Sequence, residues 1–441
     1  MTAALSVIGI IVAIVFMSWS IYKNFNPILA AIIAGLFMMV TSGMNIAETW
    51  NGAMEGVGKM LAVLAPIIVF GGIMGVLYAD SGAAASLGKL ILSPTRKMSS
   101  DAGKRIVAIT LFLIVRAVIG LSGMDAGALI VPSAALCIAI FAELNIPVKY
   151  IPAVSIIGGT LGNVVPAAPS TINVMCEMAI PGFSSSGGIL IRVILVILLI
   201  VGTVAILNLN IAKDVANGEG YTEGKLGTPD FSDDVKRPHW ILTLLPIIGV
   251  YITYNFIPGF EAWSSLLVGT ILSIVLFAPY LPTDENSSKI KSLLRAMDRG
   301  SVVIPLQFMV VMFASNVMSL TPGMTAITNG LVSIAIPAAF ALLILAVILM
   351  GLGGSVSVIA VGAMCSATFI PMGLTPLACG IITIWASTVL DTLPINNSIF
   401  LTCQMVGTDM KHGYPPVFRV SVLLTAVLAI LATLAAVAGL I

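Results

Sequence analysis

Charged residues are scarce in this chain. Lys, Arg, Asp and Glu make up 9% of its 441 residues, whereas hydrophobic residues make up 59%. A soluble globular domain carries about 25% charged residues. The composition therefore argues against a soluble fold and predicts that lipid surrounds much of the surface. The formal net charge is only +1, and no basic patch is interleaved with aromatic residues, so nucleic acids and strongly acidic partners are not expected.

Residues that bind metals are also few. The chain has two histidines, His239 and His412, and five cysteines. No two cysteines form a C-x-x-C pair, which argues against a zinc or iron–sulfur site. We interpret the cysteines as small apolar side chains that fill gaps, and no cofactor or metal is expected. The five are Cys137, Cys176, Cys365, Cys379 and Cys403.

Motifs of common enzyme classes are missing as well. The sequence contains no G-x-S-x-G elbow, no Walker-type phosphate loop and no H-E-x-x-H pair. An intramembrane enzyme would need a nucleophile beside a base, or a metal cluster, and neither is visible. The sequence therefore predicts that the protein is not an enzyme.

Long apolar runs are abundant. The first run lacks the basic flank of a cleaved signal peptide and is long enough to cross a hydrocarbon core of about 30 Å. We therefore expect it to be a permanent membrane helix. The runs predicted to span are 4–22, 27–42, 59–79, 187–209, 239–258, 262–281, 300–318 and 419–440.

Four further apolar segments are interrupted by Gly, Pro, Asn or Asp. Segments 149–180 and 375–407 are predicted to be broken helices. Segments 106–142 and 337–370 have glycine-rich breaks, and each is either one long broken helix or a re-entrant hairpin. Their arms, of roughly 14–17 residues, are too short to span alone.

The basic loops favour the hairpins. Basic clusters lie at 96–105, 289–299 and 411–419, and the positive-inside rule places all three in the cytoplasm. Two hairpins give ten spans, with these clusters on one face and both termini on the other. Full spans would instead put the second cluster opposite the first. Arg192, near a predicted external end, is an exception to the rule.

The two halves of the chain resemble each other around a hydrophilic linker at 210–238. Each half, 1–209 and 239–441, holds five predicted spans. Because five is odd, the halves run in opposite directions. The predicted fold is an all-α polytopic membrane protein of two inverted repeats, each with a re-entrant hairpin and a broken helix, a pattern typical of secondary transporters. The matching segments are GAMEGVGKM (52–60) with RAMDRGSVV (295–303), GLSGMDAGALIVPSAALCIAIFAELNIP (120–147) with GLGGSVSVIAVGAMCSATFIPMGLTP (351–376), and GGTLGNVVPAAPSTINVMC (158–176) with WASTVLDTLPINNSIFLTC (385–403).

The interruptions are predicted to form the solute site. A broken helix exposes backbone groups that lipid cannot satisfy, so it is tolerated only inside protein or beside a wet cavity. There, helix N-termini favour anions and free carbonyls favour cations. The interruptions fall at 120–127, 161–171, 351–357 and 391–398. The candidate substrate-binding residues are Ser122, Gly123, Asp125, Asn163, Ser170, Thr171, Gly354, Ser355, Ser357, Asn396, Asn397, Ser398 and Arg116.

Charged residues within the apolar segments are costly and usually functional. Asp125 and Asp391 lie at interruptions and are predicted to couple transport to an ion. Arg116 either holds a substrate carboxylate, pairs with Asp125, or extends its side chain to the interface. Glu177 and Asp80, near span ends, are interpreted as structural.

Several of these segments resemble the gluconate permease (GntP) family of the ion transporter superfamily. The resemblance covers most of the chain except the linker, and the order of the segments is informative. The segments are VGKMLAVLAPIIVFGGIMGVLYADSGAA (57–84), GLSGMDAGALIVPSAAL (120–136), LGNVVPAAPSTI (161–172), GSVSVIAVGA (354–363) and LDTLPINNSIFL (390–401).

This resemblance implies uptake of a small hydroxylated or amino-bearing acid, generally with protons. It also implies a homodimer in the bacterial inner membrane, in which a mobile transport domain carries the hairpins and broken helices. The chain departs from the family pattern at Ala167 and Ala168, where the family has His and Pro nearby, and at Asn397, where it has Asp. These departures leave the substrate and the ion open.

The leading hypothesis is a cation-coupled symporter, driven by H⁺, that imports a small organic anion such as gluconate or another sugar or hydroxy acid. One alternative is an antiporter in which Asp125 and Asp391 exchange Na⁺ for H⁺. Another is Na⁺-coupled uptake of a different carboxylate or an amino acid. A channel fits paired broken helices less well than alternating access does.

Overall fold

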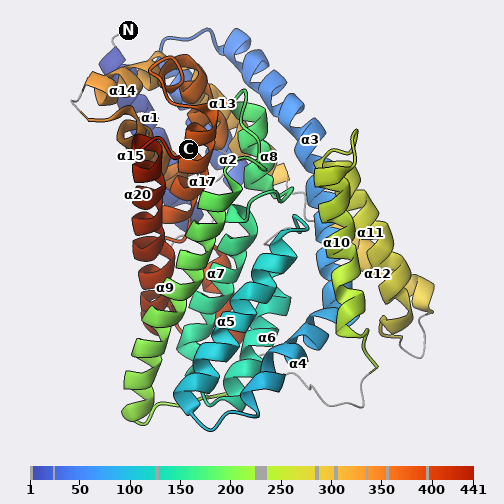
Figure 1. Cartoon of the computed structure of the whole chain (residues 1–441). Coiled ribbons are helices and arrows are strands. Elements are labelled where there is room, and N and C mark those ends of the chain that lie inside the picture. Colours follow the sequence, from blue (N-terminus) through green and yellow to red (C-terminus); the bar gives the residue numbers. More distant parts are fainter. Residues whose placement is uncertain are drawn as a thin grey trace.

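The computed structural model describes residues 3–22, 25–124, 129–223, 236–283, 288–301, 306–333, 336–353, 357–393 and 397–441. Every regular element in these ranges is a helix (Figure 1), which confirms the all-α expectation. The first part of the chain contains α1 (Ala3–Tyr22), α2 (Pro27–Thr41), α3 (Ile46–Asp80), α4 (Ala83–Thr95), α5 (Asp101–Gly120), α6 (Ile130–Glu143), η1 (Val148–Tyr150), α7 (Ile151–Val164), α8 (Thr171–Ala179) and α9 (Ile189–Ala216).

A second series follows the linker. It contains α10 (Trp240–Phe256), α11 (Ala262–Phe277), η2 (Ala278–Tyr280), α12 (Lys289–Ser301), α13 (Leu306–Leu320), α14 (Pro322–Ser333), α15 (Ala338–Gly353), α16 (Val358–Met364), η4 (Cys365–Phe369), α17 (Pro376–Val389), α18 (Asn397–Val406), α19 (Met410–Val417), η5 (Phe418–Leu423) and α20 (Leu424–Val437).

Long apolar helices account for the predicted spans. Within the described ranges, four are long and apolar enough to cross a membrane by length and composition: Leu61–Asp80, Ile189–Ala216, Ala262–Tyr280 and Met410–Val437. Shorter apolar helices of 10–17 residues occupy other predicted spans, among them Ala3–Met17, Ile28–Thr41 and Trp240–Phe256. The helices begin where the sequence supplies caps. Asn45, for example, accepts hydrogen bonds from the Ala47 and Glu48 amides at the start of α3.

Four helices differ from the sequence expectation. The amphipathic segment at 52–60 and the following span form one continuous helix, α3, of 35 residues. Helices α4 and α14, with 13 and 12 residues, had no predicted counterpart because each is too short to register as a span. Helix α9 continues to Ala216, into the segment predicted to be linker.

The contacts between helices occur in matching pairs when the two series are aligned in order. Helix α1 packs on α2 and α14, and α10 packs on α11 and α4. Helix α2 packs on α13, and α11 packs on α3. Helix α5 contacts α7 and α9, as α15 contacts α17 and α20. The first helix of each series therefore packs against a short helix of the other, α1 against α14 and α10 against α4.

The core lies around α7 and α17. Every residue from 378 to 389 of α17 is buried, and most of α7 is buried too. Helices that are apolar on all sides belong in an interior. In Figure 1, α3, α10, α11 and α12 gather at the right of the view, and α1, α13 and α14 lie at the upper left. Residues 164–170, at the interruption that follows α7, are buried as well.

Candidate functional site

All four predicted interruptions coincide with helix ends. Helix α5 ends at Gly120 and α6 begins at Ile130; α7 ends at Val164 and α8 begins at Thr171. Helix α15 ends at Gly353 and α16 begins at Val358, and α17 ends at Val389 while α18 begins at Asn397. The Gly, Pro and Asn signals thus located the breaks correctly, because these residues end helices by known backbone effects.

The first break, residues 165–170, has an unusual backbone. Pro166 and Pro169 lack an N–H, and Ala167 lies in the left-handed region at φ 55°, which alanine rarely adopts. The Ala167 amide donates to the Ser185 carbonyl at 2.8 Å, and the Ala167 carbonyl accepts from the Asn255 side chain of α10 at 3.0 Å. These two bonds hold the strained residue in place.

Two buried side chains hold the rest of this break. Arg192 of α9, fully buried, donates to the Ser185 carbonyl at 2.5 Å and to Asn173 Oδ1 at 2.7 Å. Asn173 in turn donates through Nδ2 to the carbonyls of Val165 and Ala168, at 3.0 and 2.9 Å. Sequence reasoning noted Arg192 only as an exception to the charge rule and missed Asn173. The available signal was a cation inside a long apolar helix.

The tip that follows α5 lies directly against this break. A Cβ on Gly120 would lie 2.8 Å from the Gly162 Cα, and a Cβ on Gly123 would lie 2.5 Å from the Pro169 carbonyl oxygen. Gly123 also has φ 65°, so both the contact and the conformation require glycine. The structure therefore places Gly123, next to Ser122, against the break at Pro169.

Some hydroxyl groups near the junction between the α5 tip and the first break form hydrogen bonds within the protein. Ser122 Oγ is buried and donates to the Ile119 carbonyl at 2.6 Å. Ser170 caps α8, accepting from the Asn173 amide at 3.4 Å and donating to the Asn163 carbonyl at 3.4 Å. Asn163 and Thr171 are half-buried. The junction therefore has a packed side and a partly accessible side.

The second series contributes to the same region. Helix α18 contacts α6 and α7, and α16 and α17 contact α8. A Cβ on Gly362 of α16 would lie 2.6 Å from the Ala179 carbonyl oxygen at the end of α8. The helices that flank the second-half breaks therefore pack against those that flank the first-half breaks.

The last helices hold the second broken helix. Thr392 donates to Ser421 Oγ at 2.9 Å, and Thr425 donates to the Thr388 carbonyl at 3.4 Å. Asp391 is exposed at the end of α17, although the residues before it are almost all buried.

Two other predicted residues have different surroundings. Arg116 of α5 is buried beside Gly158 of α7, and its Nε has no hydrogen-bond partner in the described part of the chain. Ser357 is fully buried and lines a small cavity with Ser315 of α13 and Ala13 of α1. Ser357 thus faces residues of α1 and α13 across this cavity.

Several predicted residues fall where the structure gives no description. Asp125, Gly354, Ser355 and Asn396 lie outside the described residues. Asn397 and Ser398 begin α18, but their side chains are not described. The pairing of Arg116 with Asp125 is consequently untested.

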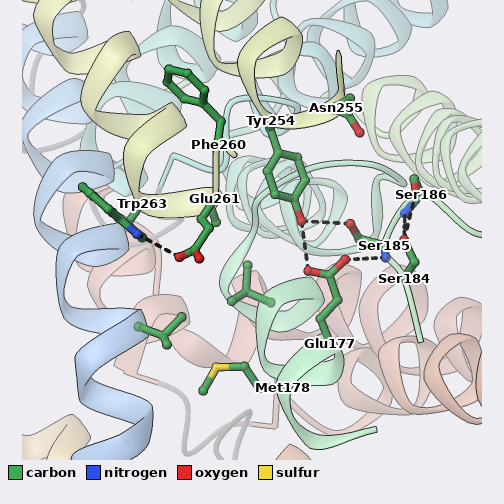
Figure 2. Close-up of a pocket in the computed structure, with 13 residues that line it drawn as sticks. Glu177, Met178, Ser184, Ser185, Ser186, Tyr254, Asn255, Phe260, Glu261 and Trp263 are labelled. Atoms are coloured by element: carbon green, nitrogen blue, oxygen red, sulfur yellow. Dashed lines mark hydrogen bonds between the residues drawn. The ribbon is translucent and has the colours of Figure 1, made fainter. Parts of the chain in front are cut away.

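A cavity of about 500 Å³ opens beside α8. Glu177 of α8 accepts the Ser185 amide at 2.6 Å and the Tyr254 hydroxyl at 3.0 Å. Figure 2 shows these groups on one wall, opposite Glu261, which accepts from Trp263 Nε1 at 2.9 Å. No Lys, Arg or His is among its described lining residues. The cavity is therefore bordered by two carboxylates and several aromatic rings.

Other charged groups are structural. Asp80, at the end of α3, forms an ion pair with Arg299 of α12, as the structural interpretation of Asp80 expects. Within the described residues, no group of three His, Cys, Asp or Glu side chains is placed to hold a metal ion.

Comparisons with known proteins agree with this architecture. A family model described as GntP family permease matches residues 1–258, more than half of the chain. The chain is 34% identical over 93 residues to the D-serine transporter DsdX of Escherichia coli O6:H1 (strain CFT073), and this match covers 21% of each protein.

A solved structure resembles the whole fold. The YdaH transporter of Alcanivorax borkumensis, whose topology is described as unusual, superposes with a TM-score of 0.56 over 87% of this chain and 88% of that one. Its sequence identity is 14%, so the likeness concerns the fold alone.

Proposed function

The chain belongs to the GntP family of permeases, and from this premise we propose that it is a cation-coupled symporter, driven by H⁺, that imports a small organic anion such as gluconate or another sugar or hydroxy acid. The family makes the protein a membrane transporter rather than an enzyme. The observation that carries the proposal is the junction of the α5 tip with the break between α7 and α8. There, Gly123 lies against Pro169, and the N-terminus of α8 opens toward the break.

The proposed architecture is a pair of inverted repeats with re-entrant hairpins at 106–142 and 337–370. The paired contacts support it, since α1 with α14 corresponds to α10 with α4, and α2 with α13 corresponds to α11 with α3. Exchange of the two series leaves this set of contacts unchanged, as a twofold relation requires. We propose the bacterial inner membrane as the location and a homodimer as the assembly.

The proposed ion-coupling residues are Asp125 and Asp391. Asp391 is exposed at the end of a buried helix, so a proton can reach its carboxylate. The substrate's carboxylate is assigned to the first break, where the helix dipole of α8 favours negative charge. We also propose that the positively charged guanidinium of Arg116 contacts the anionic substrate.

Uptake into proteoliposomes tests this function. Labelled gluconate, lactate and serine are supplied under an imposed H⁺ gradient, an imposed Na⁺ gradient, or none. H⁺-driven accumulation of gluconate or lactate is expected. Absence of gradient-driven accumulation of every carboxylate in a broad panel would contradict symport, and a pH-sensitive dye that reports Na⁺-driven proton exchange without organic solute would favour an antiporter.

A second candidate is uptake of a small amino acid. The observation that favours it is the 500 Å³ cavity, because Glu177, Glu261 and the rings of Tyr254 and Trp263 suit an ammonium group. The partial similarity to a D-serine transporter points the same way. Accumulation of serine in preference to gluconate in the same assay would select this candidate.

A further inference from the structure

Arg192 is a buried cation whose hydrogen bonds, within the described residues, all go to neutral groups. Its guanidinium donates to the carbonyls of Ser185 and Val164 and to the side chain of Asn173. Burial of an arginine is costly unless its donors are satisfied, and lipid-facing α9 has no need of one for insertion. The arrangement therefore calls for a role beyond membrane anchoring.

The contact with Asn173 fixes which way its amide points. Because Arg192 can only donate, it must face Oδ1, which turns Nδ2 toward the break. Nδ2 then donates to Val165 and Ala168. Arg192 thus acts on the break through Asn173 rather than by direct contact with its central residues.

As a result, more backbone N–H donors than backbone carbonyl acceptors are available to a ligand at the break. The carbonyls of Val164, Val165, Ala167 and Ala168 all accept hydrogen bonds from side chains. By contrast, the first two amides of α8, those of Thr171 and Ile172, donate to no group in the described ranges. With these four carbonyls engaged and the amides available, this part of the break favours an anionic group over a cation.

We infer that Arg192 is a positioning residue of the transport site: acting through Asn173, it keeps the Val165 and Ala168 carbonyls of the first break engaged by the protein, so that the break offers N–H donors to an anionic substrate group. This inference rests on the proposed function and names the polarity of its site. It assigns the substrate carboxylate, rather than a coupling cation, to the first break.

Two substitutions separate geometry from charge. Asn173→Asp still accepts from Arg192 as an ion pair but cannot donate to Val165 or Ala168. Arg192→Lys keeps the charge but replaces a planar fork of donors with a single ammonium group. The matched control is Asn210→Asp on the same helix as Arg192, because Asn210 also accepts from an arginine, Arg419, and donates to a carbonyl, that of Ile206, far from the break.

Uptake kinetics in proteoliposomes, with labelled gluconate, lactate and serine, provide the readout. Both variants are expected to raise KM by roughly tenfold while Vmax per folded protein stays within about twofold, and Asn210→Asp is expected to leave KM unchanged. A purely structural role would lower the folded fraction and Vmax without a change in KM. An unchanged KM in Arg192→Lys, or an equal rise in Asn210→Asp, would overturn the inference.

The outcomes also separate this inference from the proposed function. If the wild type accumulates none of the three solutes under any gradient, both fail together. If the wild type accumulates a solute and KM is the same in both variants, the symport proposal stands and only the role of Arg192 is rejected.

Discussion

Single residues at the first break are constrained by contact as well as by conformation. Gly123 has φ 65° and a carbonyl oxygen 2.5 Å from the position of a Cβ. Gly259 has φ 85° with nothing within 4 Å of that position. Alanine substitutions at the two glycines can therefore be compared. At Gly259 the substitution has only the cost of the left-handed conformation, about 1–2 kcal/mol, whereas at Gly123 it adds the steric overlap of the Cβ with the Pro169 carbonyl oxygen.

We expect Gly123→Ala to lower the apparent melting temperature of the purified protein more than Gly259→Ala does. We also expect Gly123→Ala to abolish uptake, since the α5 tip must move away from Pro169 to admit the methyl group. Thermal denaturation and uptake of both variants measure this. Equal effects of the two substitutions would show that the close approach at Gly123 is unimportant.

The proposed ion-coupling aspartates give a second prediction. Asp391→Asn and Asp125→Asn each remove a titratable carboxylate and are expected to reduce H⁺-driven uptake by about an order of magnitude, with little change in folded yield. Asp298→Asn, at an exposed position of α12, serves as the control. Normal H⁺-driven uptake in both variants would remove the proton-carrier role.

Sequence reasoning found some residues of the site and missed others for a physical reason. Ser122, Gly123 and Ser170 sit in the breaks, where the local Gly and Pro pattern marks them. Arg192 and Asn173 act through contacts between α9 and α8, and no local spacing reveals which carbonyls a distant arginine will reach. Glu177 was interpreted as structural because its cavity forms only when the α10–α11 loop packs nearby.

At the level of elements, the breaks were predictable but short helices were not. The positions of four interruptions follow from residues that cannot continue a helix. Helices α4 and α14 are too short for a hydropathy window and depend on packing against α10 and α1. The continuity of α3 from 46 to 80 was also missed, because its first part is amphipathic and its second part apolar.

A polar bridge between α8 and α10 gives a prediction at this scale. Tyr254 donates to Glu177, and its hydroxyl is also 3.0 Å from Ser185 Oγ. We expect Tyr254→Phe to lower the apparent melting temperature. A double-mutant cycle with Glu177→Gln is expected to give a coupling energy of about 1 kcal/mol.

Tyr251 provides the matched control for this cycle. It lies on the same helix, and its hydroxyl donates to no residue in the ranges that the structure covers. Tyr251→Phe should therefore leave the melting temperature nearly unchanged and show no coupling with Glu177→Gln. Additivity of the Tyr254 and Glu177 substitutions would mean that the bridge contributes nothing to the packing of α8 on α10.

For the whole molecule, the membrane topology remains a prediction that labelling can test. The five native cysteines are all buried, so the native thiols should contribute little to maleimide labelling of a single introduced cysteine. Ser99 and Ser288 are exposed in the first two basic loops, and Ser186 is exposed at the opposite ends of the helices. With hairpins, Ser99→Cys and Ser288→Cys face the cytoplasm and Ser186→Cys faces outward.

An impermeant maleimide added to right-side-out vesicles should label Ser186→Cys alone, whereas a permeant maleimide should label all three. Labelling of Ser288→Cys but not Ser99→Cys from outside would show that segment 106–142, which lies between these two positions, crosses the membrane completely. In that case the two halves would not be antiparallel, and the inverted repeat would be rejected.

The packing of α1 against α14 has a consequence for the insertion of the chain during its synthesis. The Gly323 amide of α14 donates to Ser6 of α1 at 2.8 Å, yet some 300 residues separate these helices in the chain. At a synthesis rate of roughly 5–20 residues per second, α1 spends on the order of 15–60 s in the membrane before its partner is made. During nascent-chain insertion the earliest helix must therefore be sheltered by lipid, by the translocation machinery or by a transient neighbour, and an arrested chain that ends before α14 should be recognised as unfinished by membrane proteases.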